Sequence, residues 1–357
     1  MSTVYAVIMA GGRGERFWPL STETLSKPFI ALLGQQTLLQ ATVDRLAPLI
    51  PPERILISIG ESHQEIAREQ LRVIPEENFI VEPVGRDTAA CLGFTALYLE
   101  RRDPECTMLA VPADHFIDDP EGFRRTLRKG IASSDGATAV VFGVKPLRPE
   151  TGYGYIQAEK PAIPVDAWPV IRFVEKPDVV TAARYAQSGN FFWNSGMFLW
   201  RNSTLLELFE EHMPATYRGL NELRPLIGRR DAWSDLRRIF SSFRRLSVDY
   251  GILEKASRLR LVPVEFMWDD IGSWSALERA LPADALGNVA RGPHVALDSN
   301  SCIVYSEDGV VATFGVSDLV VVQANGKVLV CPKRLAADLK RLVSALGQEP
   351  RGAAAKH

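Results

Sequence analysis

The sequence predicts an α/β fold with a mixed sheet, followed by a small all-β module toward the C-terminal end. Two observations support this prediction. In the first 145 residues, short apolar runs alternate with amphipathic helical stretches, which is the pattern of strands joined by covering helices. After residue 293, short β-branched runs recur about every eight to nine residues with turn signals between them. A chain of 357 residues is long enough for both parts.

Strands and helices are expected to alternate in the first part. The apolar runs with the length of buried strands are Val4–Met9, Ile55–Ile59, Phe79–Val81, Met108–Val111 and Ala139–Val144. Helical periodicity marks Thr37–Leu49, Ser62–Val73, Asp87–Arg101 and Glu121–Ser133. Asp87 has the chemistry of an N-cap. This alternation predicts a parallel sheet with helices on both faces and ligands at the carboxyl ends of its strands.

The pattern changes after residue 150. Mixed strands are predicted at Tyr155–Ala158, Ile171–Val174 and Met197–Trp200, and helices at Leu205–Glu211, Leu236–Ser242 and Val248–Lys255. A linker rich in Ala, Gly and Pro is expected at Pro282–Pro293. The β module comprises Cys302–Tyr305, Val310–Phe314, Leu319–Gln323 and Val328–Cys331, closed by a helix at Arg334–Leu346. We therefore expect two domains, residues 1–282 and 293–346.

Composition limits the partners and the compartment. A net charge of −2 argues against a nucleic-acid or membrane-surface partner. Local basic clusters at Arg124–Lys129, Arg237–Arg245 and Lys333–Arg341 are spaced like solvated helix faces. The four cysteines form no CxxC motif, so we expect neither a disulfide framework nor a cysteine metal site. No apolar stretch approaches the ~18 residues needed to cross a bilayer. A cytoplasmic protein is predicted.

A glycine-rich loop follows the first predicted strand, in the segment AGGRGERFWPL at residues 10–20. Its glycines and arginines are Gly11, Gly12, Arg13, Gly14 and Arg16. Glycine lets main-chain N–H groups approach a ligand closely, and arginines beside them form a site for a triphosphate. The loop is not a P-loop, because no Gly-Lys-Ser/Thr closes it. It is not the dinucleotide fingerprint either, because Phe17 replaces the third small residue.

Three charged residues in separate segments could act on the same phosphates. Lys27, in Ser-Lys-Pro-Phe, could return to the triphosphate as a point charge. Asp114 ends a predicted strand, and Asp270 lies in Trp-Asp-Asp-Ile-Gly-Ser-Trp; together they could converge on one Mg²⁺. The structural alternatives are a surface lysine, a turn or N-cap aspartate, and a helix-start aspartate pair.

Further polar groups could bind a sugar phosphate. Glu175 could accept hydrogen bonds from hydroxyl groups and Lys176 could neutralise a phosphate, although a surface ion pair is an equal alternative. The segments at 151–155 and 193–196 could be turns or could present amide groups to a sugar. The chain has no GxSxG or HExxH motif. Nucleotidyl transfer to a phosphate fits this absence, because it needs alignment and charge neutralisation and no nucleophile from the protein.

Eight segments carry a family resemblance. They are, in order, AGGRGERFWPL, SKPF, EPVGRDTAA, VPADH, TGYGYI, FVEKP, FFWNSGMFLW and WDDIGSW. Together they resemble the sugar-1-phosphate nucleotidyltransferases, and more narrowly the bacterial mannose-1-phosphate guanylyltransferase (GDP-mannose pyrophosphorylase) family. The resemblance implies a Rossmann-like, GT-A-like mixed-sheet catalytic domain and a short left-handed β-helix module. It implies GTP and mannose 1-phosphate as substrates, GDP-mannose and pyrophosphate as products, and Mg²⁺ as the cofactor.

The resemblance also implies roles for matching residues. The nucleotide would be bound by Ala10, Gly11, Gly12, Gly14, Glu82, Pro83, Gly85, Arg86, Asp87, Thr88 and Ala113. The sugar phosphate would be bound by Gly152, Gly154, Glu175, Lys176 and Asn194. The catalytic residues would be Arg13, Lys27, Asp114, Lys176 and Asp270, with Asp114 and Asp270 as metal ligands.

The sequence departs from the family pattern at three positions. Family members usually have Asn where Asp87 stands, Pro at Ala90 and Gln at Pro28. Another base, or another sugar phosphate such as that of glucose or a heptose, is therefore an alternative. A catalytically silent regulatory subunit of the same fold is a second alternative. Bifunctional relatives carry an added isomerase domain, which we expect this chain to lack. The terminal β module could support a homodimer.

Overall fold

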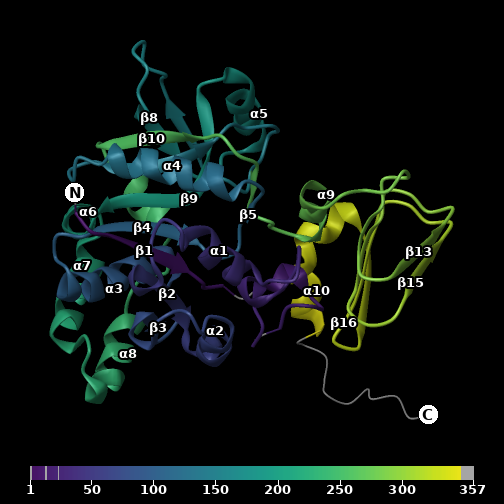
Figure 1. Ribbon diagram of the computed structural model, residues 1–357, viewed down its shortest axis with the longest axis horizontal. Helices are drawn as coiled ribbons and strands as arrows, with labels where there is room; N and C mark the ends of the chain where they lie inside the picture. The colour runs from purple at the N-terminus through teal and green to yellow at the C-terminus, as the bar shows by residue number, and fades with distance from the viewer. Residues whose placement is uncertain (1, 13, 23, 347–357) are drawn as a thin grey trace. The chain divides into compact units, whose positions relative to one another are not determined.

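The computed structural model describes residues 2–12, 14–22 and 24–346. The chain forms two compact units, which Figure 1 shows in the colours of the chain order. Unit 1 comprises the N-terminal segment up to Gly11, Gln40–Ala113 and Ile117–Trp268. Unit 2 comprises Gly12–Leu39, Asp114–Phe116 and the chain from Asp269 on. The glycine-rich loop therefore contributes residues to both units.

A nine-stranded mixed sheet organises unit 1. Its strands are β1 (Val4–Met9), β2 (Ile55–Gly60), β3 (Phe79–Glu82), β4 (Thr107–Pro112), β6 (Ala139–Val144), β7 (Tyr155–Ala158), β8 (Trp168–Val174), β9 (Phe191–Arg201) and β10 (Leu259–Val264). Their order is β3-β2-β1-β4-β9-β6-β10-β8-β7. The first four are parallel, as the sequence predicts, and β9 runs antiparallel to both β4 and β6. β5 (Phe116–Ile117) and β11 (Trp268–Asp269) form a separate two-stranded ladder.

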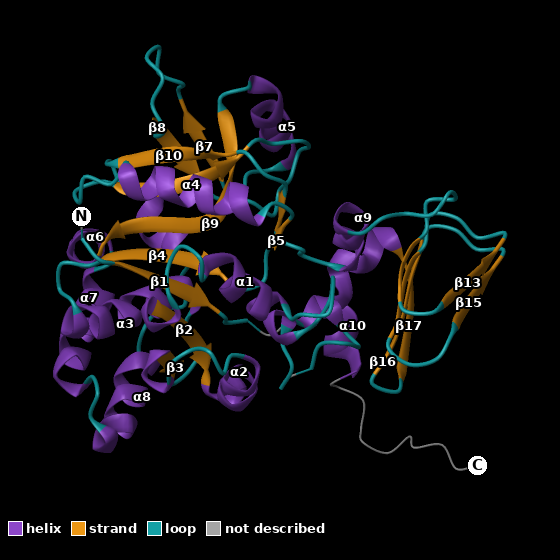
Figure 2. Ribbon diagram, viewed as in Figure 1, coloured by secondary structure: helices purple, strands orange, loops and turns teal. Residues whose placement is uncertain are grey.

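Helices cover both faces of this sheet (Figure 2). They are α1 (Leu38–Leu46), α2 (Gln64–Gln70), α3 (Asp87–Arg102), α4 (Pro120–Ala132), α5 (Val179–Ser188), α6 (Asn202–His212), α7 (Pro214–Leu223) and α8 (Trp233–Ser241). On one face, Val141 and Trp200 of the sheet join a core with residues of α3, α6, α7 and α8. On the other face, α4 packs so closely that a Cβ at Gly130 would lie 2.6 Å from the Phe142 ring.

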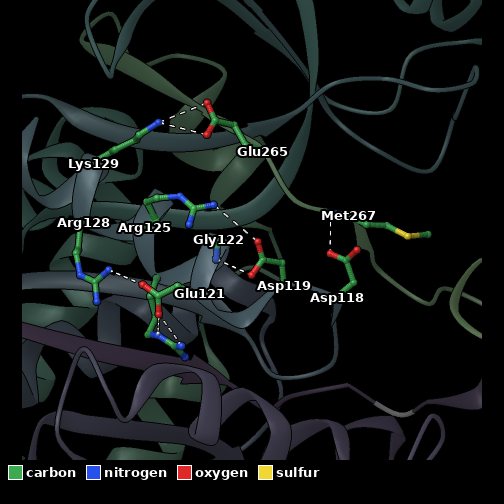
Figure 3. A network of polar contacts seen from close by, with 10 residues as sticks. Asp118, Asp119, Glu121, Gly122, Arg125, Arg128, Lys129, Glu265 and Met267 are labelled. Carbon is green, nitrogen blue, oxygen red and sulfur yellow. Dashed lines mark hydrogen bonds and ion pairs between the residues drawn. The ribbon is translucent and has the colours of Figure 1, made fainter.

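The basic face of α4 is neutralised by acidic side chains (Figure 3). Asp119 caps the helix by accepting from the N–H of Gly122 at 2.8 Å. Glu121 pairs with Arg128 at 3.0 Å, and Lys129 pairs with Glu265 at 3.4 Å. The structure therefore confirms that the Arg124–Lys129 cluster is a solvated helix face.

Unit 2 contains a short β-helix. Its strands are β12 (Val289–Arg291), β13 (His294–Leu297), β14 (Ile303–Ser306), β15 (Val311–Phe314), β16 (Leu319–Ala324) and β17 (Lys327–Pro332). They form a four-stranded sheet, β12-β14-β16-β17, and a two-stranded sheet, β13-β15. The β16–β17 hairpin turns at Asn325-Gly326, both with positive φ, as the sequence signal predicts.

The β-helix shares a core with the segments around the glycine-rich loop. α9 (Leu277–Ala280) and α10 (Leu339–Leu346) belong to the same unit. The ring of Trp274 lies 5.2 Å from that of Phe17 and 5.4 Å from that of Tyr305. Buried Ile271 joins the same core. The residues that flank the predicted phosphate and metal groups are therefore anchored by apolar packing.

Several sequence expectations need correction. The expected linker Pro282–Pro293 contains β12, whose Val289 is buried against the β-helix core; three residues are too few to show a strand period. The strand expected at Met197–Trp200 begins six residues earlier, because an irregular register with β6 accommodates the Asn-Ser-Gly segment. The closing helix begins as a 3₁₀ turn, Lys333–Asp338. Three α-helices, α5, α7 and α9, were not expected.

Candidate active site

The glycine-rich loop leaves β1 and turns sharply at Gly14. Gly14 has a φ of +61°, and a Cβ there would lie 2.8 Å from the main-chain nitrogen of Lys27. The hydroxyl group of Ser21 donates to the Gly14 carbonyl oxygen at 2.6 Å. Both the backbone angle and the close approach of a second segment therefore require glycine at this position. Arg13, which the sequence predicts as a catalytic residue, lies outside the described residues.

Lys27 joins the two segments that carry the predicted metal ligands. Its ammonium group lies 2.8 Å from Oδ2 of Asp114 and donates to the main-chain oxygen of Asp270. The Lys27 side chain is 9% exposed and that of Asp114 28% exposed. Burial by itself would raise the pKa of Asp114, but the charges of Lys27 and His115 outweigh it and hold that pKa below its usual value. We call Lys27, Asp114 and Asp270 the Lys27 cluster; all three belong to unit 2.

The two adjacent aspartates of the Asp-Asp-Ile-Gly segment have different surroundings. The buried carboxylate of Asp269 forms an ion pair with Arg279 and accepts from the N–H of Ile271 at 2.8 Å. The Asp270 carboxylate instead faces Gly272, where a Cβ would lie 3.1 Å from its Oδ2 and 3.4 Å from Nη1 of Arg16. Asp269 is thus held in an internal ion pair, while Asp270 lies beside an arginine of the glycine-rich loop.

The predicted base-binding motif lies at the end of β3 and the start of α3, in unit 1. Glu82 is buried and accepts from the hydroxyl group of Ser58 at 3.0 Å; burial raises the pKa of its carboxyl group. Asp87 is exposed and accepts from the N–H of Thr88 at 2.8 Å. Asp87 is the first residue of α3, and the N-cap is Arg86, so the N-cap prediction is off by one residue. The φ of Asp87 is +69°. Arg86 donates to the main-chain oxygen of Ser241.

A second ionic group, also in unit 1, is built on the predicted sugar residues. Lys176 Nζ lies 2.8 Å from Oε1 of Glu175, whose side chain is 6% exposed. The other carboxylate oxygen of Glu175 is buried without a hydrogen-bond partner among the described residues. A Cβ at Gly154 would lie 2.2 Å from that oxygen, so the carboxylate depends on glycine there. Asn194 donates from Nδ2 to Oδ1 of Asp249 at 2.7 Å.

We call Glu175, Lys176, Asn194 and Asp249 the Glu175 cluster. Burial, together with the negative charge of Asp249, raises the pKa of Glu175 to about 6 despite the nearby ammonium group of Lys176. Burial also raises the pKa of Asp249. A carboxyl group with an unpaired buried oxygen and a pKa near neutrality is typical of a binding or catalytic site and not of a surface ion pair.

Backbone strain marks three of the predicted motifs. In the described chain, the residues other than glycine with positive φ are Asp87, Lys176, Ile271, Asp298, Ser301, Asp318 and Asn325. The last four lie in turns of the β-helix, and the first three lie in the base, sugar and metal motifs. Ile271 is β-branched and buried, so a positive φ there is costly and is maintained by its packing.

The structure thus brings the predicted residues together in groups. Lys27, Asp114 and Asp270 are in contact through Lys27, and Gly154, Glu175, Lys176 and Asn194 lie together. Gly152 is exposed and donates to its neighbour Glu150 at 3.1 Å. Sequence reasoning missed Asp249, which follows Ser-Val in an expected helix and carries no local signal of a binding role.

Two further predicted nucleotide-binding residues, Ala10 and Ala113, are buried and directly follow β1 and β4. The N–H of Ala10 donates to the carbonyl oxygen of Ser58, and the N–H of Ala113 donates to the carbonyl oxygen of Met9.

None of the helices in the described part of the chain combines the length and apolar character that a membrane crossing needs. Among the described residues, no group of three or more histidine, cysteine, aspartate or glutamate side chains could hold a metal ion.

Comparison with known proteins agrees with this geometry. The sequence profile of the nucleotidyl transferase family matches residues 5–286, and that of the MannoseP isomerase/GMP-like β-helix domain matches residues 292–346. The chain is 38% identical over 363 residues to the mannose-1-phosphate guanylyltransferase of Escherichia coli, covering 98% of this chain and 75% of that protein. It is 37% identical over 363 residues to the xanthan biosynthesis protein XanB of Xanthomonas campestris, covering 100% of this chain and 76% of that protein. A crystal structure named mannose-1-phosphate geranyltransferase, from Thermus thermophilus, matches with a TM-score of 0.89 and 40% identity, covering 97% of this chain and 99% of that one.

Proposed function

This chain belongs to the mannose-1-phosphate guanylyltransferase family of nucleotidyl transferases, and from that premise we propose that it transfers GMP from GTP to α-D-mannose 1-phosphate. A phosphate oxygen of the sugar phosphate attacks the α-phosphorus of GTP in line with the departing group. The new P–O bond completes GDP-mannose, and the broken P–O bond releases pyrophosphate. The attacking oxygen is already an anion at neutral pH, so the protein supplies alignment and charge neutralisation.

The observation that carries this proposal is the position of Lys27. A buried ammonium group that touches Asp114 and the Asp270 main chain orders the two carboxylate-bearing segments. We propose that Lys27 and Arg13 stabilise the negative charge that develops on the departing pyrophosphate. Gly11, Gly12 and Gly14 would receive the triphosphate through their main-chain N–H groups.

Nucleotidyl transferases generally use a divalent metal ion, and we propose that this one uses Mg²⁺. The donor set fits, because carboxylate oxygens are the ligands that Mg²⁺ prefers and the lowered pKa of Asp114 keeps that carboxylate ionised. Asp114 and Asp270 would hold the ion, and phosphate oxygens would complete its coordination. When bound, the ion would neutralise the reacting phosphates.

The base and the sugar would be bound by unit 1. We assign the base to the motif from Glu82 to Thr88, where Asp87 could accept from the N–H groups of guanine. The buried Glu82, which accepts a hydrogen bond from the hydroxyl group of Ser58, would stabilise this motif. We assign the mannose hydroxyl groups to Glu175 and Asn194, and the sugar phosphate to Lys176. The unpaired oxygen of Glu175 supports this assignment, because a bound hydroxyl group would satisfy it.

The test is pyrophosphate release from GTP with mannose 1-phosphate and Mg²⁺, compared with ATP, UTP and dTTP and with glucose 1-phosphate. We expect the highest kcat/KM for GTP with mannose 1-phosphate. Faster turnover with another base or sugar would replace the assigned substrates but keep the reaction class. No release with any pair would leave the regulatory-subunit alternative.

We also propose the domain division at residues 282 and 293, a cytoplasmic location and a homodimer formed through the β-helix. The family profiles support the division, and the four free thiols support a reducing compartment. For the dimer, β17 is an edge strand whose Val328 and Val330 are 63% and 58% exposed. Light scattering should give a dimer for the native chain and a monomer for Val328→Lys with Val330→Lys; an unchanged mass would place the interface elsewhere.

A further inference from the structure

Asp249 lies in a backbone feature that is uncommon in proteins. It begins η8, a single π-helical turn at Asp249–Leu253. Such turns are rare and occur often at functional sites, because they shift a side chain relative to a regular helix. Asp249 uses this position to contact Asn194, which is far away in the sequence and lies in the central strand β9.

The hydrogen bonds of Asn194 fix its carboxamide at both ends. Nδ2 donates to Oδ1 of Asp249 at 2.7 Å, and the carboxamide oxygen accepts from the N–H of Gly196 at 3.0 Å. A flipped amide would place its oxygen against the Asp249 carboxylate and its nitrogen against the N–H of Gly196, so Asp249 and Gly196 together determine which end carries the nitrogen. One N–H of Nδ2 is not used by these bonds and remains available as a donor.

The turn that carries Asp249 is itself anchored. The N–H of Val248 donates to the hydroxyl oxygen of Thr88 at 2.9 Å, and the N–H of Ala89 donates to the carbonyl oxygen of Leu246 at 3.3 Å. Both contacts join the segment before η8 to the start of α3. The backbone that carries Asp249 is therefore fixed by hydrogen bonds to α3. A residue that orients another side chain needs such support.

We propose that Asp249 is a positioning residue for sugar-phosphate binding, which orients the Asn194 amide so that one N–H points to a sugar hydroxyl group. This inference rests on the proposed role of Asn194 in sugar binding. It assigns to Asp249 no contact with the substrate. The loss of the hydrogen bond from Asn194 to Asp249 should then weaken sugar binding through Asn194, whereas the loss of the Asp249 charge, which also acts on Glu175, is common to Asp249→Ala and Asp249→Asn.

A double-mutant cycle on the full-length enzyme tests this coupling. We expect Asp249→Ala to raise the KM for mannose 1-phosphate about 10- to 100-fold, because it leaves the Asn194 carboxamide held only by the N–H of Gly196, and to change the KM for GTP and kcat less than about threefold. Asn194→Ala should have a similar effect, and the double variant should be no worse than either single variant. Asp249→Asn keeps an acceptor oxygen and should restore most of the affinity. Asp235→Ala, an exposed carboxylate of α8, is the control and should leave both KM values unchanged.

Multiplying effects in the double variant would overturn the proposal, as would equal losses for both substrates. Asp249→Leu branches at the same carbon as the carboxylate but accepts no hydrogen bond, and it replaces the alanine variant if that variant does not fold. A second measurement does not depend on the substrate. In a proton–nitrogen-15 correlation spectrum, the chemical shift of one Asn194 side-chain amide proton should lie downfield in the native protein and in Asp249→Asn. It should move upfield in Asp249→Leu, where the acceptor is lost. An unchanged signal would contradict the positioning role even if the enzyme used another sugar, whereas a shifted signal without GDP-mannose formation would reject only the proposed function.

Discussion

The Lys27 and Glu175 clusters contain the same pair of groups in opposite environments. In each, a lysine ammonium group lies 2.8 Å from a carboxylate oxygen. In the Lys27 cluster the lysine is 9% exposed and Asp114 is 28% exposed, whereas Lys176 is 51% exposed and Glu175 only 6%. The pKa of Asp114 is lowered, and that of Glu175 is raised to about 6.

The difference shows that the distance between two charges does not decide the protonation state. A buried lysine beside a partly solvated carboxylate stabilises its negative charge, as a metal ligand requires. A half-exposed lysine loses much of its effect to solvent, while burial and Asp249 act against the charge on Glu175. One cluster is thus suited to hold positive charge near phosphates, and the other is suited to exchange hydrogen bonds with hydroxyl groups.

The largest effect is expected from the carboxylates of the Lys27 cluster. Asp270→Asn and Asp114→Asn should each lower metal-dependent turnover about a thousandfold or more, because each removes a proposed metal ligand while leaving the fold intact. Pyrophosphate release as a function of Mg²⁺ concentration measures this. Asp269→Asn is the matched comparison: it disturbs the ion pair with Arg279 and should lower thermal stability while the metal dependence persists. Near-native turnover of Asp270→Asn would remove it from the metal site.

A smaller effect is expected when Lys27 or Lys176 is replaced, one at a time, by methionine. Lys27→Met should lower kcat about 100-fold and destabilise the protein by about 1–3 kcal/mol, because Asp114 loses its partner. The destabilisation should be present at neutral pH and shrink in acid, as Asp114 becomes protonated. Lys176→Met should instead raise the KM for mannose 1-phosphate with little loss of stability. Denaturant unfolding and steady-state kinetics distinguish the two, and equal stability losses would erase the contrast.

Glu175→Gln tests the raised pKa directly. A carboxyl group with a pKa near 6 in the folded protein and near 4.5 when unfolded binds its proton more tightly when folded. The native protein therefore loses stability as the pH rises from 4.5 to 6, and the glutamine variant does not. The stability difference should grow by about 2 kcal/mol across this window and stay constant above it. Urea unfolding at several pH values measures the difference, and a flat profile would mean that Glu175 titrates normally.

The smallest effect is expected from an exposed pair. Lys129 and Glu265, drawn in Figure 3, lie 3.4 Å apart with 30% and 58% exposure. Glu265→Gln should change the free energy of unfolding by less than about 0.5 kcal/mol, because solvent screens both charges. Thermal unfolding at low and high salt checks this. A loss comparable to that of Lys27→Met would show that burial is not the variable that separates the clusters.

Local sequence predicted the parts of the fold that depend on neighbouring residues. β1 and β6 occupy the expected residues, because continuous apolar runs of that length are buried strands. The Asn325-Gly326 turn and the Gly14 turn follow from the backbone freedom of those residues. The order of the motifs was enough to indicate the family, since each motif keeps its residues within a few positions of one another.

The sequence by itself determined where strands, turns and charged motifs lie, because these depend on side-chain period and on local backbone angles. Only the tertiary structure decided that Asp269 forms an ion pair with Arg279 and that Asp249 accepts a hydrogen bond from Asn194. It also decided that β9 continues through the Asn-Ser-Gly segment. Those contacts join residues that are adjacent only after folding. The same holds for the pKa values of Asp114 and Glu175, since the burial and the neighbouring charges that set them arise from packing between segments that are distant in the sequence.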